Sequence, residues 1–441
     1  MTRTAFILLL TVLWCAPGFA QQTDSPPIAL AELEQRALST NPTLRQATAA
    51  IDAARGRARQ AGAWPNPVIG YTGEELATRN LDDRGAHGFF VDQTIPLGGK
   101  RGLNRAVFDR DIEQAEAVRE QQRLRILSSV RTLFYDVLTT ERRVAVMERL
   151  AQLGAEAVGI TRQLFNVGAA DQPDVLESAI EARRVQLQLT AARNELVANR
   201  WQLAAMVGDR ALLDRRLDGS LEQAIPELER DSVVKRLVEQ SPELRAARAA
   251  ADRTRAVVTS ARRLTFPDLF ARGGLQYNRE PFEGTSSAVG WQASAEVGVS
   301  VPLFSRNQGL IAAARADEIR VDAELRRLEF ELESRAAVAF SEYLTGLRAS
   351  EAYRAEILPQ AEQAYALYLA RYREGAAAYP QVLIAQRTLF DMTIEYFDYI
   401  EAAWLAALRL QGFLVGEGLE APEIVGETIG VSVEIPAGGE R

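Results

Sequence analysis

A stretch of 67 residues, from Lys100 to Asn166, contains no proline and is rich in alanine, leucine, arginine, glutamate and glutamine, which favour helix formation. Its apolar residues recur with a spacing close to 3.5, as in the seam between two long packed helices. They are Leu127, Val130, Phe134, Val137, Val144 and Met147. At 1.5 Å per residue such a helix would be about 100 Å long, more than a compact domain needs. The sequence therefore predicts an elongated helical protein.

The residues after this helix predict a tight turn and a second helix that runs back along the first. Gly168 stands where a helix end often takes the left-handed conformation, and Asp171 can cap the following helix. The returning helix is predicted from Gln172 to about Met206. Together these elements form a long helical hairpin with a tight tip.

The chain contains this hairpin twice. A second long helix is predicted from Asn307 to Glu374, a second tip at residues 375–380, and a second return from Gln381 to Val415. Shorter matches extend the duplication upstream, with an offset that grows from 200 to about 207 residues. They pair Asn41-Pro42 with Ser241-Pro242, Trp64-Pro65 with Phe266-Pro267, and Ile95-Pro96-Leu97 with Val301-Pro302-Leu303. We therefore predict two structural repeats, 21–220 and 221–420, followed by a flexible C-terminal tail, 421–441.

Each repeat also contains two predicted strands, which precede its long helix. They are predicted at Val68–Leu76 and Gly88–Ile95 in the first repeat and at Leu269–Tyr277 and Trp291–Val301 in the second. In the last strand, apolar and polar residues alternate over eleven residues, which fits either lipid on one side and water on the other, or a half-buried strand in a soluble sheet. Four strands cannot close a barrel, and open edges are not tolerated in lipid. If these strands span a membrane, three chains would give a 12-stranded barrel wide enough to conduct.

The N-terminal segment and the overall charge indicate where the chain works. Residues 1–20 have the features of a secretory signal peptide, with Arg3 before an apolar run and a small-x-small cleavage site ending at Ala20. Cleavage there would remove Cys15, the only cysteine, and Trp14 before it argues against lipidation. The formal net charge of −8 argues against a nucleic-acid partner.

No combination of residues predicts a catalytic site, a cofactor site or a metal site, so we expect no enzyme activity. The single histidine, His87, comes just before a predicted strand and is interpreted as a solvated loop residue. Gly98-Gly99-Lys100 lacks the rest of a phosphate-binding loop and is interpreted as a joint between strand and helix. Pro359 should mark a bend in the second long helix, because proline removes a backbone donor.

The signal peptide, the duplicated strand–strand–hairpin unit and the tip sequences together resemble the TolC-type outer-membrane efflux family. The tip Arg371-Tyr372-x-x-Gly375, followed by Val382-Leu383-x-Ala385-Gln386, is very similar to the hairpin tip of that family. Residues 95–101 and 301–309 are similar to its CzcC-like branch, which serves heavy-metal pumps of the resistance–nodulation–division class.

This resemblance implies a mainly α-helical homotrimer, with a 12-stranded β-barrel in the outer membrane and an α-helical barrel across the periplasm. It implies a passive conduit for heavy-metal cations whose tips dock on a periplasmic adaptor protein, which in turn joins an inner-membrane pump. The tip residues implied in docking are Phe165, Gly168, Asp171, Arg371, Tyr372, Gly375 and Leu383. The family often has serine where this chain has Asp171 and Ala378, so contacts of that serine do not carry over.

Threefold symmetry would turn Asp171 and Asp174 into an acidic ring at the tunnel entrance. The alternative is that Asp171 only caps the helix and Asp174 only complements its dipole. Two other functions stay open: the same channel could serve a drug pump or type I protein secretion, or the chain could be a secreted coiled-coil protein without a pore.

Overall fold

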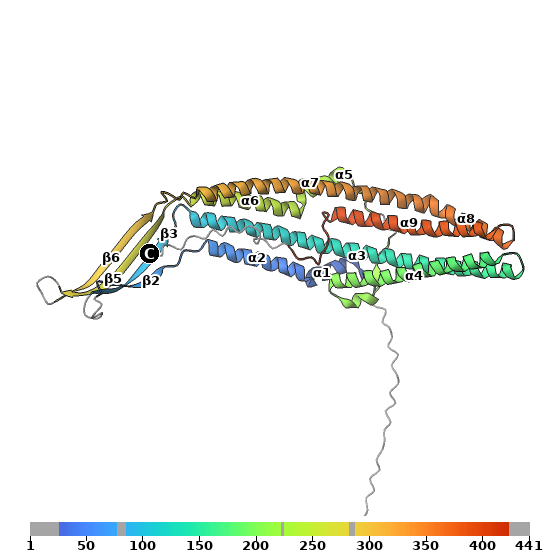
Figure 1. The fold of residues 1–441 in the computed structure, drawn as a ribbon, viewed down its shortest axis with the longest axis horizontal. Helices are drawn as coiled ribbons and strands as arrows, with labels where there is room; N and C mark the ends of the chain where they lie inside the picture. The colour runs from blue at the N-terminus through green and yellow to red at the C-terminus, as the bar shows by residue number, and fades with distance from the viewer. Residues whose placement is uncertain (1–25, 77–84, 222–224, 282–286, 423–441) are drawn as a thin grey trace, which may run out of the picture.

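The computed structural model describes residues 26–76, 85–221, 225–281 and 287–422. The molecule is elongated: a β-sheet lies at one end, two helical hairpin tips lie at the other, and long helices run between them (Figure 1). The predicted signal peptide with Cys15, and residues 423–441 of the predicted tail, lie outside the described residues.

The helices of the first repeat follow the sequence prediction closely. They are α1 (Leu30–Thr40), α2 (Pro42–Ala61), α3 (Lys100–Asn166) and α4 (Gln172–Val207). Ile28–Ala29 form the short strand β1, which pairs in parallel with β4 (Leu217–Asp218), beyond the 3₁₀ turn Arg210–Asp214.

The second repeat has the same order of elements. Its helices are α5 (Arg230–Gln240), α6 (Pro242–Arg263), α7 (Gln308–Ala352), α8 (Leu358–Arg373) and α9 (Tyr379–Gln411). Just before Pro359, where the sequence predicts a bend, a π-helical turn at Tyr353–Ile357 separates α7 from α8. The Leu358 N–H donates to the Tyr353 carbonyl, five residues back, so the helix changes its hydrogen-bond pattern just before the proline, which has no N–H.

The four predicted strands are present and form one antiparallel sheet. They are β2 (Val68–Glu74), β3 (Ala86–Ile95), β5 (Asp268–Pro281) and β6 (Ala288–Ser300), in the order β2-β3-β5-β6. The pairing of β3 with β5 joins the two repeats, while the outer edges of β2 and β6 have no partner strand among the described residues.

The helices pack around separate apolar clusters along the body. One cluster near its middle joins α1, α3, α4 and α9, and includes Leu33, Val130, Leu203 and Trp404. A second cluster lies toward the tips and includes Met147, Val185, Tyr372 and Phe390. Five of the six predicted seam residues are buried, namely Leu127, Val130, Phe134, Val137 and Met147. The sixth, Val144, is half-buried.

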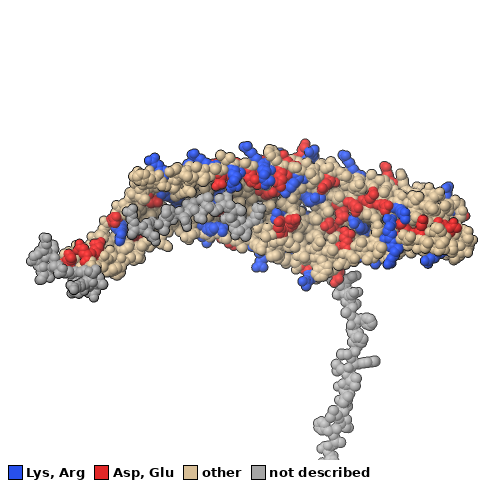
Figure 2. Space-filling model, viewed as in Figure 1, with Lys and Arg blue, Asp and Glu red and all other residues tan. Residues whose placement is uncertain are grey.

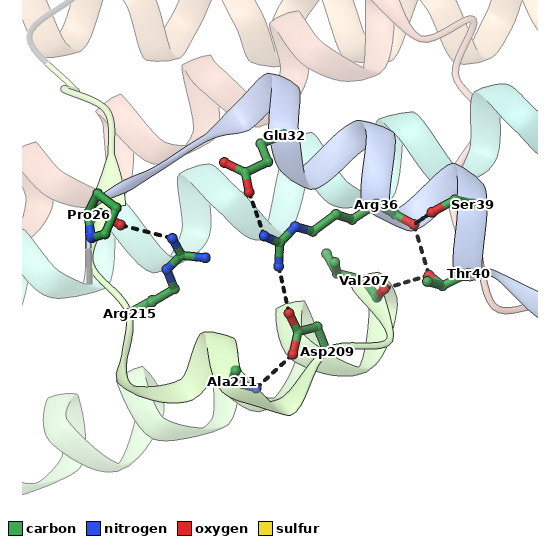
Figure 3. Close-up of polar contacts among 9 residues, drawn as sticks. All are labelled: Pro26, Glu32, Arg36, Ser39, Thr40, Val207, Asp209, Ala211 and Arg215. Carbon is green, nitrogen blue, oxygen red and sulfur yellow. Dashed lines mark hydrogen bonds and ion pairs between the residues drawn. The ribbon is translucent and has the colours of Figure 1, made fainter. Parts of the chain in front are cut away.

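Polar contacts fix α1 against the end of α4 (Figure 3). The Arg36 guanidinium bonds Asp209 at 2.8 Å and Glu32 at 2.5 Å, and the Thr40 hydroxyl donates to the Val207 carbonyl at 2.7 Å. Arg215 donates to the Pro26 carbonyl at 3.2 Å. The start of the described chain is therefore tied to the hairpin halfway along the body.

Candidate functional site

The two long helices end in the same backbone motif. At the first tip the Gly168 N–H donates to the Phe165 carbonyl at 3.0 Å, and the Ala169 N–H donates to the Leu164 carbonyl at 2.8 Å. The second tip repeats both bonds, with the same distances, between Gly375 and Tyr372 and between Ala376 and Arg371. This is the Schellman arrangement, which requires a left-handed residue, and the two glycines have φ of 75° and 72°.

The returning helices begin in different ways. Asp171 and Asp174 form a capping box, in which the Asp171 N–H donates to the Asp174 carboxylate at 3.2 Å. The equivalent cap residue in the second hairpin, Ala378, has no side chain that can accept such a bond. There Tyr379, at the first helical position, is instead buried in the cluster near the tips. The first tip is thus polar where the second is apolar.

The residues that the sequence predicts at the tips divide into two groups. Phe165, Gly168, Asp171, Arg371 and Gly375 are exposed. Tyr372 and Leu383 are buried between the hairpins.

The Tyr372 ring lies 5.6 Å from the Tyr379 ring, centroid to centroid. Burial raises the pKa of both phenols, which stay neutral at physiological pH.

A buried carboxylate that the sequence analysis did not identify joins the two hairpins. Glu181 on α4 has a side chain only 1% exposed, and it bonds Arg184 at 2.7 Å and Arg387 on α9 at 3.0 Å. A buried carboxylate needs such partners, since removing it from water is costly otherwise. Glu181 and Arg387 are 206 positions apart in the chain, so no local pattern indicates the pair.

A second group of charges lies near the middle of the body. Arg143 on α3 bonds Asp398 at 2.9 Å and Glu401 at 3.0 Å, both on α9. Asp136, about two turns before Arg143 on α3, has no partner for Oδ1 within the described chain. Burial, with Glu401 and Glu195 nearby, raises the pKa of the Asp136 carboxyl to about 7.

The sheet has two chemically different faces. Residues that pair directly across the strands lie on the same face. One row consists of Tyr71, Phe89, Leu275 and Ala293, and the next of Ile69, Val91, Gly273 and Ala295. Phe89, Ile69 and Leu275 are 60–73% exposed, so this apolar face is uncovered in the single chain.

The opposite face carries the polar residues of the same strands. Asp92, Arg272 and Glu296 pair in one row, and Gln276 and Gln292 pair in another. Phe90 and Phe270 also lie here, each over a glycine of the neighbouring strand. The predicted alternation is therefore confirmed, and it extends over all four strands.

His87 lies within β3 rather than in the solvated loop that the sequence predicted. Its Nδ1 contacts the Tyr71 hydroxyl on the apolar face of the sheet. Among the described residues no group of three or more His, Cys, Asp or Glu side chains is arranged to hold a metal ion. In the same part of the chain, no helix has the length and apolar character needed to cross a membrane.

A sheet with one apolar and one polar face at one end of a long helical body, with hairpin tips at the other, is the architecture of an elongated protein with membrane-type strands. Comparison with known proteins names the family. The model of the family described as "Outer membrane efflux protein" matches residues 33–209 and 233–414. The chain belongs to this family.

Individual proteins support the assignment. The chain is 27% identical over 434 residues to the cobalt-zinc-cadmium resistance protein CzcC of Cupriavidus metallidurans, covering 94% of this chain and all of that one. It is 25% identical to the nickel-cobalt-cadmium resistance protein NccC of Alcaligenes xylosoxydans xylosoxydans, covering 74% of each. The solved structure of the outer-membrane channel OprN has the same fold, with a TM-score of 0.74, 19% identity and coverage of 89% of this chain and 91% of that chain.

Proposed function

We propose that this protein is the outer-membrane channel of a tripartite efflux system and that it exports heavy-metal cations. The observation that carries the proposal is the two-faced sheet joined to the helical body. One face has the apolar surface that lipid requires, and the other has the polar surface of a water-filled lumen. The similarity to CzcC and NccC, whose names refer to metal resistance, supports metal cations as the substrate.

The open edges of the sheet support a trimer. Strands β2 and β6 have unpaired edges, and lipid does not tolerate unpaired backbone groups. Three copies would join β6 of one chain to β2 of the next and close a 12-stranded barrel, below which the helices would form a periplasmic tunnel.

The hairpin tips suit docking to an adaptor that links the tunnel to an inner-membrane pump. Phe165, Gly168, Asp171, Arg371 and Gly375 form the exposed surface there. The buried Tyr372 and Leu383 would act by holding the tip in shape.

Two neighbouring residues of β6 test the placement of the sheet. Ala293 lies on the apolar face and Gln292 on the polar face, at the same depth. We expect Ala293→Arg to reduce the yield of heat-resistant trimers in outer-membrane extracts, because an arginine facing lipid near the membrane centre costs about 2–4 kcal/mol. Gln292→Arg should assemble normally. Equal yields from the two variants would contradict the membrane placement.

The exported substrate can be identified in cells from which the gene for this protein has been deleted. Complementation with the parent chain should restore growth in cobalt, zinc, cadmium or nickel salts, and Ala293→Arg should restore less. Restored resistance to drugs but not to any of these metals would instead support a drug-efflux channel. Restored secretion of a protein would support the type I secretion alternative.

A further inference from the structure

A concentration of basic residues lies where the sheet joins the helices. The four chain segments at this joint are residues 56–67, 96–107, 259–268 and 301–315, and we call them the basic collar. Together they contain nine basic residues and one acidic residue, Asp268. The basic residues are Arg57, Arg59, Lys100, Arg101, Arg105, Arg262, Arg263, Arg306 and Arg315. The charge is notable because the whole chain is acidic, with a net charge of −8.

The fold brings these segments to one end of the sheet (Figure 1). Because neighbouring strands are antiparallel, one end of the sheet contains the start of β2, the end of β3, the start of β5 and the end of β6. Direct contacts join the segments. The Arg101 guanidinium donates to the Gly62 carbonyl at 2.8 and 3.2 Å, and Lys100 Nζ lies 2.8 Å from the Asp268 carboxylate.

The collar carries more positive charge than its own carboxylate can neutralise. Asp268 is the only carboxylate within it, and Lys100 pairs with that group. Arg262, Arg263 and Arg306 are exposed and form no ion pair with any described carboxylate. The first turns of α3 and α7, which begin in the collar, contain no acidic residue that would oppose an anion at their positive ends. Blue side chains are visible at the end of the helical body next to the sheet, and red ones toward the far end of the sheet (Figure 2).

Large aromatic side chains stand among these arginines and are exposed. Trp64 is 58% exposed, Phe266 is 47% exposed and Phe304 is 94% exposed. The Arg101 guanidinium lies 3.9 Å from the centroid of Trp64, and that of Arg263 lies 4.9 Å from the centroid of Phe266. Aromatic rings beside cationic groups are typical of the boundary between hydrocarbon and headgroups, and the collar directly continues the apolar face of the sheet.

We propose that the basic collar binds the headgroups of anionic phospholipids in the periplasmic leaflet of the outer membrane. The inference rests on the placement of the sheet in that membrane, which is part of the proposed function. Arg262, Arg263 and Arg306 supply charge-assisted hydrogen bonds to lipid phosphate, and Trp64 and Phe266 insert beside the glycerol region. Lipid binding at the collar fixes how deeply the sheet sits in the bilayer.

Quenching of tryptophan fluorescence by brominated lipids measures this binding. Trp64 is in the collar and Trp291 is on the sheet, so a Trp291→Phe background leaves Trp64 as the reporter nearest the headgroups. We expect the full trimer, in mixed bilayers, to bind brominated phosphatidylglycerol at least about fivefold more tightly than brominated phosphatidylcholine at low ionic strength. The preference should fall toward one at high ionic strength, because salt screens exposed charges. Equal quenching by the two lipids would overturn the proposal.

A matched pair of triple variants locates the site. The collar variant is Arg262→Gln/Arg263→Gln/Arg306→Gln, and the control variant is Arg183→Gln/Arg326→Gln/Arg348→Gln. The control removes the same charge from exposed positions on α4 and α7 that lie at least about 16 Å along the helices from the collar. We expect the collar variant to lose most of the lipid preference and the control to keep it.

Each other outcome is decisive. A collar variant that retains the preference, or a control that loses it equally, would overturn the collar as the binding site. If the collar variant forms no trimer, the lipid and salt dependence of the parent chain still decides the question. A trimer that conducts ions but shows no lipid preference overturns this inference alone, whereas a chain that neither inserts nor is quenched overturns the proposed function.

Discussion

Gly168 and Gly375 occupy equivalent places in the two tips and have nearly the same positive φ, although the third residue after each differs, Asp171 in one tip and Ala378 in the other. No atom lies within 4 Å of the position where a Cβ at Gly375 would be. The need for glycine is therefore conformational rather than steric, and a β-branched residue is the least tolerant of such a backbone.

We expect Gly375→Val to leave the trimer inserted in the membrane but to abolish metal resistance, because the turn must move away from its left-handed conformation. Forcing positive φ on such a residue costs about 1–2 kcal/mol, which shifts the local turn without unfolding the long helices. Gly375→Asn is the control, since asparagine tolerates this region. Growth in metal salts and trimer yield would be measured together, and full resistance with the valine variant would show that tip geometry does not matter.

Asp136 makes stability depend on pH. Its pKa is raised from an ordinary value of 3.8 to about 7. Between these values the folded chain keeps a proton that the unfolded chain has lost, so the free energy of unfolding falls as pH rises through this window and stays low above it.

Asp136→Asn should therefore raise the melting temperature of the trimer above pH 7 and leave it nearly unchanged at acidic pH, where the parent carboxyl is already protonated. A tenfold difference in proton affinity between the folded and unfolded chain corresponds to about 1.4 kcal/mol. Glu177→Gln, which neutralises an exposed carboxylate on α4, is the control and should produce no such difference. Melting curves on both sides of the window would test this, and an equal gain at both pH values would rule the explanation out.

The sequence predicted those features of the tips that depend on neighbouring residues. The left-handed glycine and the cap at Asp171 each follow from a few adjacent side chains. Burial of Tyr372 and Leu383 depends on how one hairpin lies on the other, which local patterns do not contain. The bond between Glu181 and Arg387 could not be predicted for the same reason.

The helices and strands were predicted better than the contacts between them. Both ends of α3 agree with the prediction, because Gly98-Gly99 and Gly168 mark them locally. The pairing of β1 with β4 was missed, since two residues per strand give no periodicity and the strands are far apart in the chain. The π-helical turn was expected only as a bend, because proline indicates a disturbance but not its form.

Helices α7 and α9 approach so closely that one glycine is required between them. A Cβ at Gly346 would lie 2.8 Å from both the Ala403 nitrogen and the Tyr399 carbonyl oxygen, which are backbone atoms that cannot turn aside. We expect Gly346→Ala to lower stability by about 1–3 kcal/mol, as overpacking usually does. Thermal unfolding of the purified trimer would measure the change.

Gly159 on α3 provides the matched control for this substitution. No atom lies within 4 Å of the place that a Cβ would take there, and alanine favours helix over glycine by up to about 1 kcal/mol. Gly159→Ala should therefore be neutral or stabilising. If Gly346→Ala behaved in the same way, the hairpin would be more loosely packed than these distances indicate.

The surface of the molecule differs in character from one end to the other. The sheet at one end has the faces of a membrane strand, the joint is basic, and the tips at the other end are the exposed ends of long hairpins (Figures 1 and 2). A single chain cannot close its sheet into a barrel, since the described sheet has two open edges and its apolar face is uncovered. The proposed trimer would close the barrel and bring three copies of each tip around one axis.

The acidic tip residues acquire a role only in such a trimer. Threefold symmetry would place three copies of Asp171 and three of Asp174 at the tunnel entrance, and rings of carboxylates favour cations at a constriction. The capping box between the two residues explains their presence without any such role. The two interpretations differ in what happens when the charge is removed and the cap is kept.

Asp171→Asn/Asp174→Asn provides that change, because asparagine caps a helix about as well as aspartate. If the ring contributes, purified trimers in planar bilayers should lose part of their cation preference and their sensitivity to divalent cations. The effect should weaken at high salt, which screens exposed carboxylates. Glu177→Gln in the same returning helix controls for the loss of bulk charge. Unchanged selectivity and divalent sensitivity in the double variant would mean that Asp171 and Asp174 serve only to begin α4.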